Sequence, residues 1–177
     1  MSSSTKTQSN TVSSECKLTC DFEILQKSPV FGGADTEVLK LFAYLAKRKK
    51  YHPGSEIIAM ENEAEAAYYL ISGKAELTTM HHGNKVVLQH LTPQTFFGEL
   101  ALLARFKWFF SVQAVEPCEV MIITRESFKK VLENFPNRRE RLVEKIVQLR
   151  VERLMEQTAF LLDKVPSHLL GKTGPAL

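Results

Sequence analysis

The sequence is poor in the residues that mark disulfide-bonded, disordered or membrane-spanning chains. Its 177 residues include three cysteines, eight glycines and seven prolines. The cysteines, at positions 16, 20 and 118, are too few and too unevenly spaced for a disulfide framework. No apolar run approaches the roughly 18 residues of a membrane span, and the N-terminus lacks the basic and apolar regions of a signal peptide. We therefore expect a cytoplasmic protein that is neither secreted nor membrane-spanning.

Net charge is also small. The chain has 23 basic and 20 acidic residues, a balance of +3, which does not support nucleic-acid binding without strong clustering. A DNA-binding regulator is disfavoured as well, because only residues 166–177 follow Val165 and a helix-turn-helix needs more. With 44% hydrophobic and 24% charged residues, the composition is that of one globular domain.

Motifs for catalysis and metal binding are missing. The sequence has no nucleophile–base pairing, phosphate-binding P-loop or zinc pattern. Cys16 and Cys20 have no second ligand pair nearby, and His81 and His82 fall in a predicted hairpin turn. We expect no catalytic residues, no metal site and no enzymatic activity.

Three segments differ in composition. Residues 1–19 are rich in serine and predict a flexible tail, residues 20–165 predict the domain, and residues 166–177 predict a frayed end. Inside the domain, helical spacing of apolar residues predicts a helix that starts near Asp35 and ends in the basic residues 47–50.

From Tyr51 to Ile123 the pattern changes to short strands separated by turn residues. Many short strands at near-regular spacing favour an all-β barrel or roll. A helix that Pro136 closes and a longer one from about Arg138 to about Lys164 complete a mainly β fold with flanking helices. The predicted strands cover residues 56–60, 67–71, 74–80, 85–91, 111–115 and 118–123.

The last helix has two apolar faces. Leu142, Ile146 and Leu149 form a stripe suited to lie on the barrel. A second seam has the alternating spacing of four and three that coiled coils use, and it predicts a homodimer or a partner protein bound through this helix. The alternative is a single wide stripe packed on its own domain. The seam consists of Val147, Val151, Leu154, Thr158, Leu161 and Val165.

The order of these elements resembles the cyclic nucleotide-binding domain, over residues 22–164. That family includes sensor domains of catabolite-activator-type regulators, regulatory subunits of kinases, and nucleotide-gated channels. The resemblance implies a β-roll (a double-stranded β-helix or jelly roll) at about 51–123, N-terminal helices, closing B and C helices at about 125–164, and a non-enzymatic regulatory module. It depends on the motifs at residues 28–31, 51–58, 68–77 and 97–103, of which the last is similar to the start of the family's phosphate-binding cassette.

The resemblance also implies a ligand, a cyclic nucleotide such as cAMP or cGMP. A Gly-Glu turn that opens a short helix directs backbone N–H groups toward a phosphate, and the family's glutamate, here Glu99, accepts from a ribose hydroxyl. Arg153 lies near the position from which family members reach the base, although it could instead be a solvated arginine. The candidate ligand-binding residues are Phe97, Gly98, Glu99, Leu100, Ala101, Arg105, Trp108, Phe109, Phe110, Ser111 and Arg153.

One departure from the family pattern bears on that ligand. Counting from Gly98 places Trp108 where the family has the arginine that neutralises the phosphate, and phenylalanines at 109 and 110 replace small residues. Loss of such a charge-assisted contact costs about 1.5–3 kcal/mol, or about tenfold to a hundredfold in affinity. Arg105 lies three residues too early to replace it, and Lys107 offers only a point charge.

Three interpretations stay open. The roll binds a cyclic nucleotide, or its aromatic lining binds a different small effector. In the third, the aromatic residues fill the pocket themselves and the domain is a scaffold for protein interaction or dimerisation.

Overall fold

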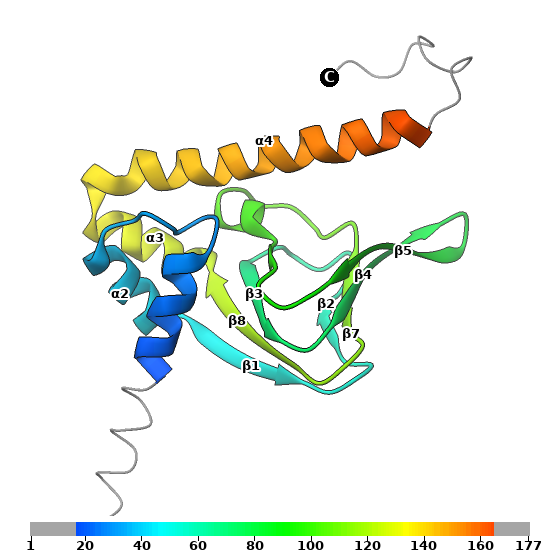
Figure 1. The fold of residues 1–177 in the computed structure, drawn as a ribbon, viewed down its shortest axis with the longest axis horizontal. Helices are drawn as coiled ribbons and strands as arrows, with labels where there is room; N and C mark the ends of the chain where they lie inside the picture. Colours follow the sequence, from blue (N-terminus) through cyan, green and yellow to red (C-terminus); the bar gives the residue numbers. More distant parts are fainter. Residues whose placement is uncertain (1–16, 165–177) are drawn as a thin grey trace, which may run out of the picture.

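The structure, a computed structural model, describes residues 17–164 and forms a β-roll with helices gathered at one end and along one side (Figure 1). Two antiparallel four-stranded sheets make the roll, in the orders β1-β8-β3-β6 and β2-β7-β4-β5. The predicted mainly β fold is confirmed. The strands are β1 (Lys47–Tyr51), β2 (Glu56–Ile58), β3 (Ala66–Ser72), β4 (Ala75–His81), β5 (Asn84–Leu91), β6 (Phe96–Phe97), β7 (Ser111–Ala114) and β8 (Cys118–Thr124).

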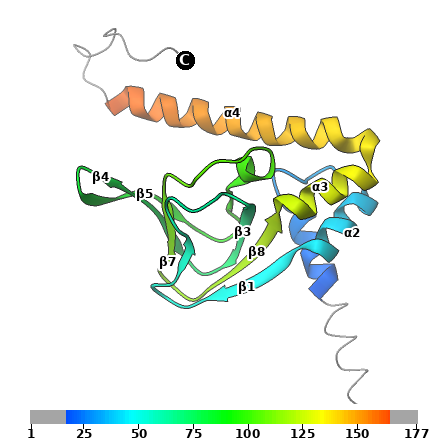
Figure 2. The same cartoon turned by 180° about the vertical axis from the view of Figure 1, so that it is seen from behind.

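The helices frame the roll. A first helix covers the described residues 17–27, so it includes residues 17–19 of the expected tail; the rest of that tail and the expected frayed end lie outside the described residues. Seen from behind, α4 again runs along the roll while the β4–β5 hairpin projects from it (Figure 2). Between residues 17 and 164, no helix combines the length and apolarity needed to cross a membrane. The other helices are α2 (Thr36–Leu45), η1 (Glu99–Leu102), α3 (Arg125–Asn134), η2 (Pro136–Arg138) and α4 (Arg139–Lys164).

The core has two compartments, which β3 and β8 separate. Along β3, Ala67 and Tyr69 face the helices, whereas Tyr68 and Leu70 face the interior of the roll. This alternation is the two-residue period of a strand that is covered on both sides. The stripe predicted at the start of α4 joins the helical compartment, since Leu142 and Ile146 are buried there.

The basic residues 47–50 are not the end of a helix, as the sequence analysis expected. Helix α2 ends at Leu45, and residues 47–51 form β1, an edge strand that pairs with β8. An edge strand tolerates charged side chains that face solvent. Arg48 alone turns inward, and its Nε donates to Asp21 Oδ1 at 2.6 Å.

The partner of Arg48 is fully buried. Asp21 has no exposed surface, and this burial raises the pKa of its carboxyl although Arg48 donates to it. Arg48 also donates to Glu119 at 3.3 Å and so joins the N-terminal helix to β1 and β8.

We predict that Arg48→Met lowers the free energy of unfolding by about 3–5 kcal/mol at pH 7, because it leaves a buried carboxylate without a counter-charge. The substitution raises the pKa of Asp21 further, so the folded variant takes up a proton more readily than its unfolded chain. The difference in free energy of unfolding between the variant and wild type therefore shrinks as the pH falls from 7 toward 5. Urea unfolding at both pH values measures this. Lys50→Met, which removes an exposed charge from the same strand, should change stability by less than about 0.5 kcal/mol; equal losses in the two variants would contradict the role of the pair.

Candidate functional site

The candidate site is centred on the turn between β6 and η1. Strand β6 pairs with β3, with Phe97 opposite Tyr68, and Gly98 follows in the left-handed conformation with φ 75°. Helix η1 begins at Glu99, and the N–H groups at the start of a helix have no partner within it. The turn therefore has the backbone geometry of the expected cassette.

The segment that carries Trp108 is fixed by backbone hydrogen bonds to the turn at residues 61–64. Trp108 donates its N–H to Asn62 O at 2.9 Å, and Trp108 O accepts from Glu61 N at 2.7 Å. Phe106 O accepts from Ala64 N at 2.8 Å. Side chains alternate along such an extended segment, so Lys107 points to solvent and Trp108 points into the roll.

The indole of Trp108 fills the space beside the cassette turn. It is 3% exposed and packs against the rings of Phe106 and Phe110, at centroid distances of 5.1 and 5.2 Å. Its Cη2 atom lies 3.0 Å from the place where a Cβ on Gly98 would stand. The missing side chain of Gly98 thus gives room to the indole.

Tyr68 completes the aromatic lining. Its ring stacks on Phe97 with centroids 5.5 Å apart and planes inclined by 14°. Burial raises the pKa of Tyr68 to about 12, so its phenol stays protonated and neutral at physiological pH. The aromatic side chains that line the roll next to Gly98 are therefore uncharged.

Glu99 is buried and already paired. Its side chain accepts from Arg153 Nη1 at 3.0 Å, and Glu99 is 3% exposed. Arg153 Nη2 also donates to Phe96 O at 2.6 Å. Arg153, whose side chain is 27% exposed, is therefore paired rather than free in solvent: it joins α4 to both ends of the cassette turn.

A second arginine, which the sequence analysis missed, holds the other end of η1. Arg125 donates to Ala101 O and Ala104 O, each at 2.6 Å, and to Ala64 O. Arg125 is the first residue of α3, where the helix dipole disfavours a cation. That unfavourable position was the only signal in the sequence that this arginine has another role.

The structure brings together part of the expected site. Phe97, Gly98, Ala101, Trp108 and Phe110 lie in or beside the inner compartment of the roll, and Leu100 is half-buried on η1. Three further candidates lie apart from it. Arg105 is exposed, Phe109 is 60% exposed, and the Ser111 hydroxyl lies between Met60 N at 3.0 Å and Glu56 Oε1 at 2.9 Å.

Comparisons with known proteins agree with this geometry. A family model described as "Cyclic nucleotide-binding domain" matches residues 48–135. Catabolite activator protein from Thermus thermophilus is 28% identical and superposes with a TM-score of 0.64, over 77% of this chain and 62% of that one. The chain belongs to the cyclic nucleotide-binding domain family. The resemblance noted in the sequence is thereby confirmed, and the family is regulatory rather than catalytic.

Further relatives of this cyclic nucleotide-binding domain come from eukaryotes. The regulatory domain of Toxoplasma gondii PKA, solved with cAMP, is 25% identical with a TM-score of 0.62, over 66% of this chain and 45% of that one. The mouse hyperpolarization-activated cyclic nucleotide-gated channel 2 is 28% identical over 147 residues, which are 83% of this chain and 16% of the channel. The chain thus spans less than a fifth of the length of the channels it matches.

In this cyclic nucleotide-binding domain, two cationic side chains near the cassette contact protein oxygens. The guanidinium groups of Arg125 and Arg153 both reach the cassette, and each binds carbonyl or carboxylate oxygens. The resemblance implies an arginine that neutralises the phosphate at position 108, and this position carries the buried indole of Trp108.

We predict that Gly98→Ala is about 1–3 kcal/mol more destabilising than Gly54→Ala, because only the first introduces a methyl group into the indole. Both glycines have a left-handed φ, of 75° and 81°, so the backbone strain is matched, and a Cβ on Gly54 would meet nothing within 4 Å. Urea unfolding of the two variants measures the difference. Equal losses would mean that the indole does not pack against this turn.

Proposed function

We propose that this chain is a non-enzymatic regulatory module whose β-roll is filled by its own aromatic side chains. In this proposal the module acts through α4 on a second copy of itself or on a partner protein, without a bound nucleotide. The observation that carries it is the position of the Trp108 indole, 3% exposed and in van der Waals reach of Gly98.

The first argument is steric. A phosphate at the cassette turn needs the space next to the Gly98 backbone, and the Trp108 ring is packed there between Phe106 and Phe110. Expelling a tryptophan from such a position forfeits buried contacts worth about 3–5 kcal/mol, by analogy with truncation of buried aromatic residues. A ligand would have to supply that free energy before it gained any affinity.

The second argument is electrostatic. A buried phosphate needs a partner of opposite charge, and both arginines that reach the cassette already bind protein oxygens. The nearby cations of Arg105 and Lys107 are on exposed side chains. These contacts support a cassette that retains its backbone shape without the side chain that would hold the anion.

The third argument concerns the surface through which the module contacts a second copy or a partner protein. Arg153 and Glu99 tie the middle of α4 to the cassette, whereas α4 is largely solvent-exposed beyond Arg153. Of the predicted seam, Leu154 is 51% exposed. Exposed apolar side chains at heptad spacing are typical of a helix that packs against a partner helix. Val147, Val151, Thr158 and Leu161 are exposed as well.

A second candidate function is a sensor of a cyclic nucleotide or another small effector that displaces the indole. The observation that favours it is the pairing of Glu99 with Arg153 at 3.0 Å. A ribose hydroxyl that bound Glu99 would compete with Arg153, release α4 from the cassette and so couple the roll to the helix.

We predict that neither cAMP nor cGMP binds the wild-type protein with a dissociation constant below about 1 mM, and that Trp108→Arg creates measurable binding. The substitution removes the indole and supplies the guanidinium that pairs with phosphate. Isothermal titration calorimetry on both proteins measures this.

The matched control is Phe109→Arg, which adds the same charge at the neighbouring, exposed position. This variant should give no measurable heat of nucleotide binding. Micromolar binding by the wild type would overturn the filled-roll proposal and support the sensor.

We predict that the wild-type chain sediments as a dimer at high micromolar concentration and that Leu154→Glu is monomeric, because a carboxylate in the seam would be desolvated on association. Analytical ultracentrifugation measures both. Ala159→Glu, an exposed position on α4 outside the predicted seam, adds the same charge and should stay dimeric. A monomeric wild type would remove dimerisation from the proposal and leave a partner protein.

A further inference from the structure

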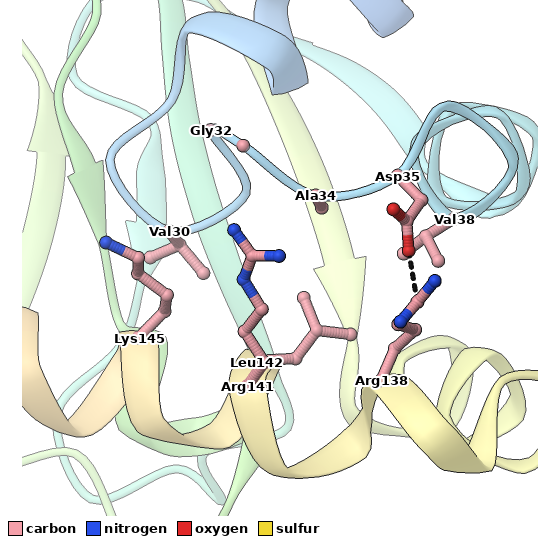
Figure 3. Close-up of a pocket in the computed structure, with 10 residues that line it drawn as sticks. Val30, Gly32, Ala34, Asp35, Val38, Arg138, Arg141, Leu142 and Lys145 are labelled. Atoms are coloured by element: carbon pink, nitrogen blue, oxygen red, sulfur yellow. Dashed lines mark ion pairs between the residues drawn. The ribbon is translucent and has the colours of Figure 1, made fainter.

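A small cavity lies outside the roll, between the first turns of α4 and the segment of residues 30–38 that leads into α2 (Figure 3). Its volume is about 20 Å³. A cavity of this kind needs about 10–15 Å³ to hold one water molecule, so one or two oxygen atoms of a larger group fit inside it. It is too small for a nucleotide.

Three cations and a single acid line the cavity, together with six glycine or apolar residues. The acid, Asp35, forms an ion pair with Arg138 and is therefore already used. Arg141 and Lys145 have no ion pair within residues 17–164. In Figure 3 their side chains leave the same side of α4 and extend toward the loop at Val30 and Gly32. Two unpaired cations thus reach one small space.

Their spacing makes this arrangement unfavourable without an anion. Arg141 and Lys145 are four residues apart, one helical turn, and like charges at that spacing repel each other. Glu140 and Glu144, the nearest acids on α4, line a different depression together with Arg139. The helix therefore separates its acidic side chains from the two cations that reach the cavity.

Two glycines lie in the opposite wall of the cavity, and one of them faces Arg141. A Cβ on Gly32 would lie 2.8 Å from Ser28 O, so no side chain fits at that position. A Cβ on Gly33 would lie 3.8 Å from Arg141 Nη2, and the φ of Gly33 is 82°. Glycine at position 33 therefore lets the backbone of the loop approach the guanidinium, whereas glycine at position 32 allows the close approach to the Ser28 carbonyl.

We propose that Arg141 and Lys145 form a binding site for a small oxyanion, the phosphate or carboxylate group of a metabolite. The guanidinium offers two parallel N–H donors to such a group, and the ammonium adds a point charge. A bound oxyanion would lie between the loop before α2 and the first turns of α4. Arg153 lies eight residues, about 12 Å, beyond Lys145 on the same helix. The site lies outside the roll and does not depend on whether the roll is filled.

The test is an NMR titration of the full-length protein with inorganic phosphate at constant ionic strength, following the amide signals of Gly32 and Gly33. We expect saturable shifts, and we expect Arg141→Gln/Lys145→Gln to weaken phosphate binding about tenfold or more. Arg139→Gln is the matched control: it removes a cation from the same helix that does not line the cavity, and it should leave the affinity within about twofold of wild type.

A parallel titration with acetate separates the two sources of the oxyanion. Tighter binding of phosphate supports a phosphorylated ligand, and tighter binding of acetate supports a carboxylate. Either result supports the site if the double substitution weakens the binding about tenfold or more. The proposal is overturned if neither anion gives saturable shifts, or if the double variant binds as tightly as the Arg139→Gln control.

Discussion

The packing of Trp108 against Gly98 is the contact on which the arrangement of this domain's interior depends. The backbone bonds from residues 106–108 to the turn at 61–64 point the indole inward, and the absence of a Cβ at position 98 lets it approach the cassette. A cavity in a protein interior is costly unless something fills it. In the filled-roll proposal, the side chain at position 108 takes the place of a ligand beside the cassette turn.

The guanidinium groups of three arginines join the elements of the domain to one another. Arg125 holds the end of η1 to α3, Arg153 holds α4 to the turn, and Arg48 holds the N-terminal helix to β1 and β8. In each case a planar group with several donors satisfies oxygens from two or more elements, which a lysine could not do with the same geometry. These three arginines thus hold parts of the domain together, and in the filled-roll proposal Arg125 and Arg153 are not free to bind an anion at the cassette.

Local patterns in the sequence were enough to predict the fold and the position at which the chain departs from the family pattern. Strand spacing predicted the roll, and counting from Gly98 placed Trp108 at the expected arginine position. What the sequence could not supply were contacts between distant residues. Basic residues such as 47–50 suit the end of a helix, and the partners that place them in a strand are distant in the sequence: Asp21 for the Arg48 side chain and β8 for the backbone. Likewise, the pairing of Arg153 with Glu99 spans 54 residues, and nothing near either residue indicates it.

These contacts also bear on how α4 could transmit a signal. Its first turns are anchored by buried Leu142 and Ile146, its middle by Arg153, and its second half by few contacts with the roll. A helix held in this way can change its direction only by exchanging one of the two anchors, because buried apolar packing is discrete rather than continuously adjustable. The Arg153–Glu99 contact is the weaker anchor, since it is partly solvated and involves one side chain from each element. An event that competes for Glu99, or that pulls on the start of α4, would therefore act first at this contact and only afterwards on the apolar seam beyond it.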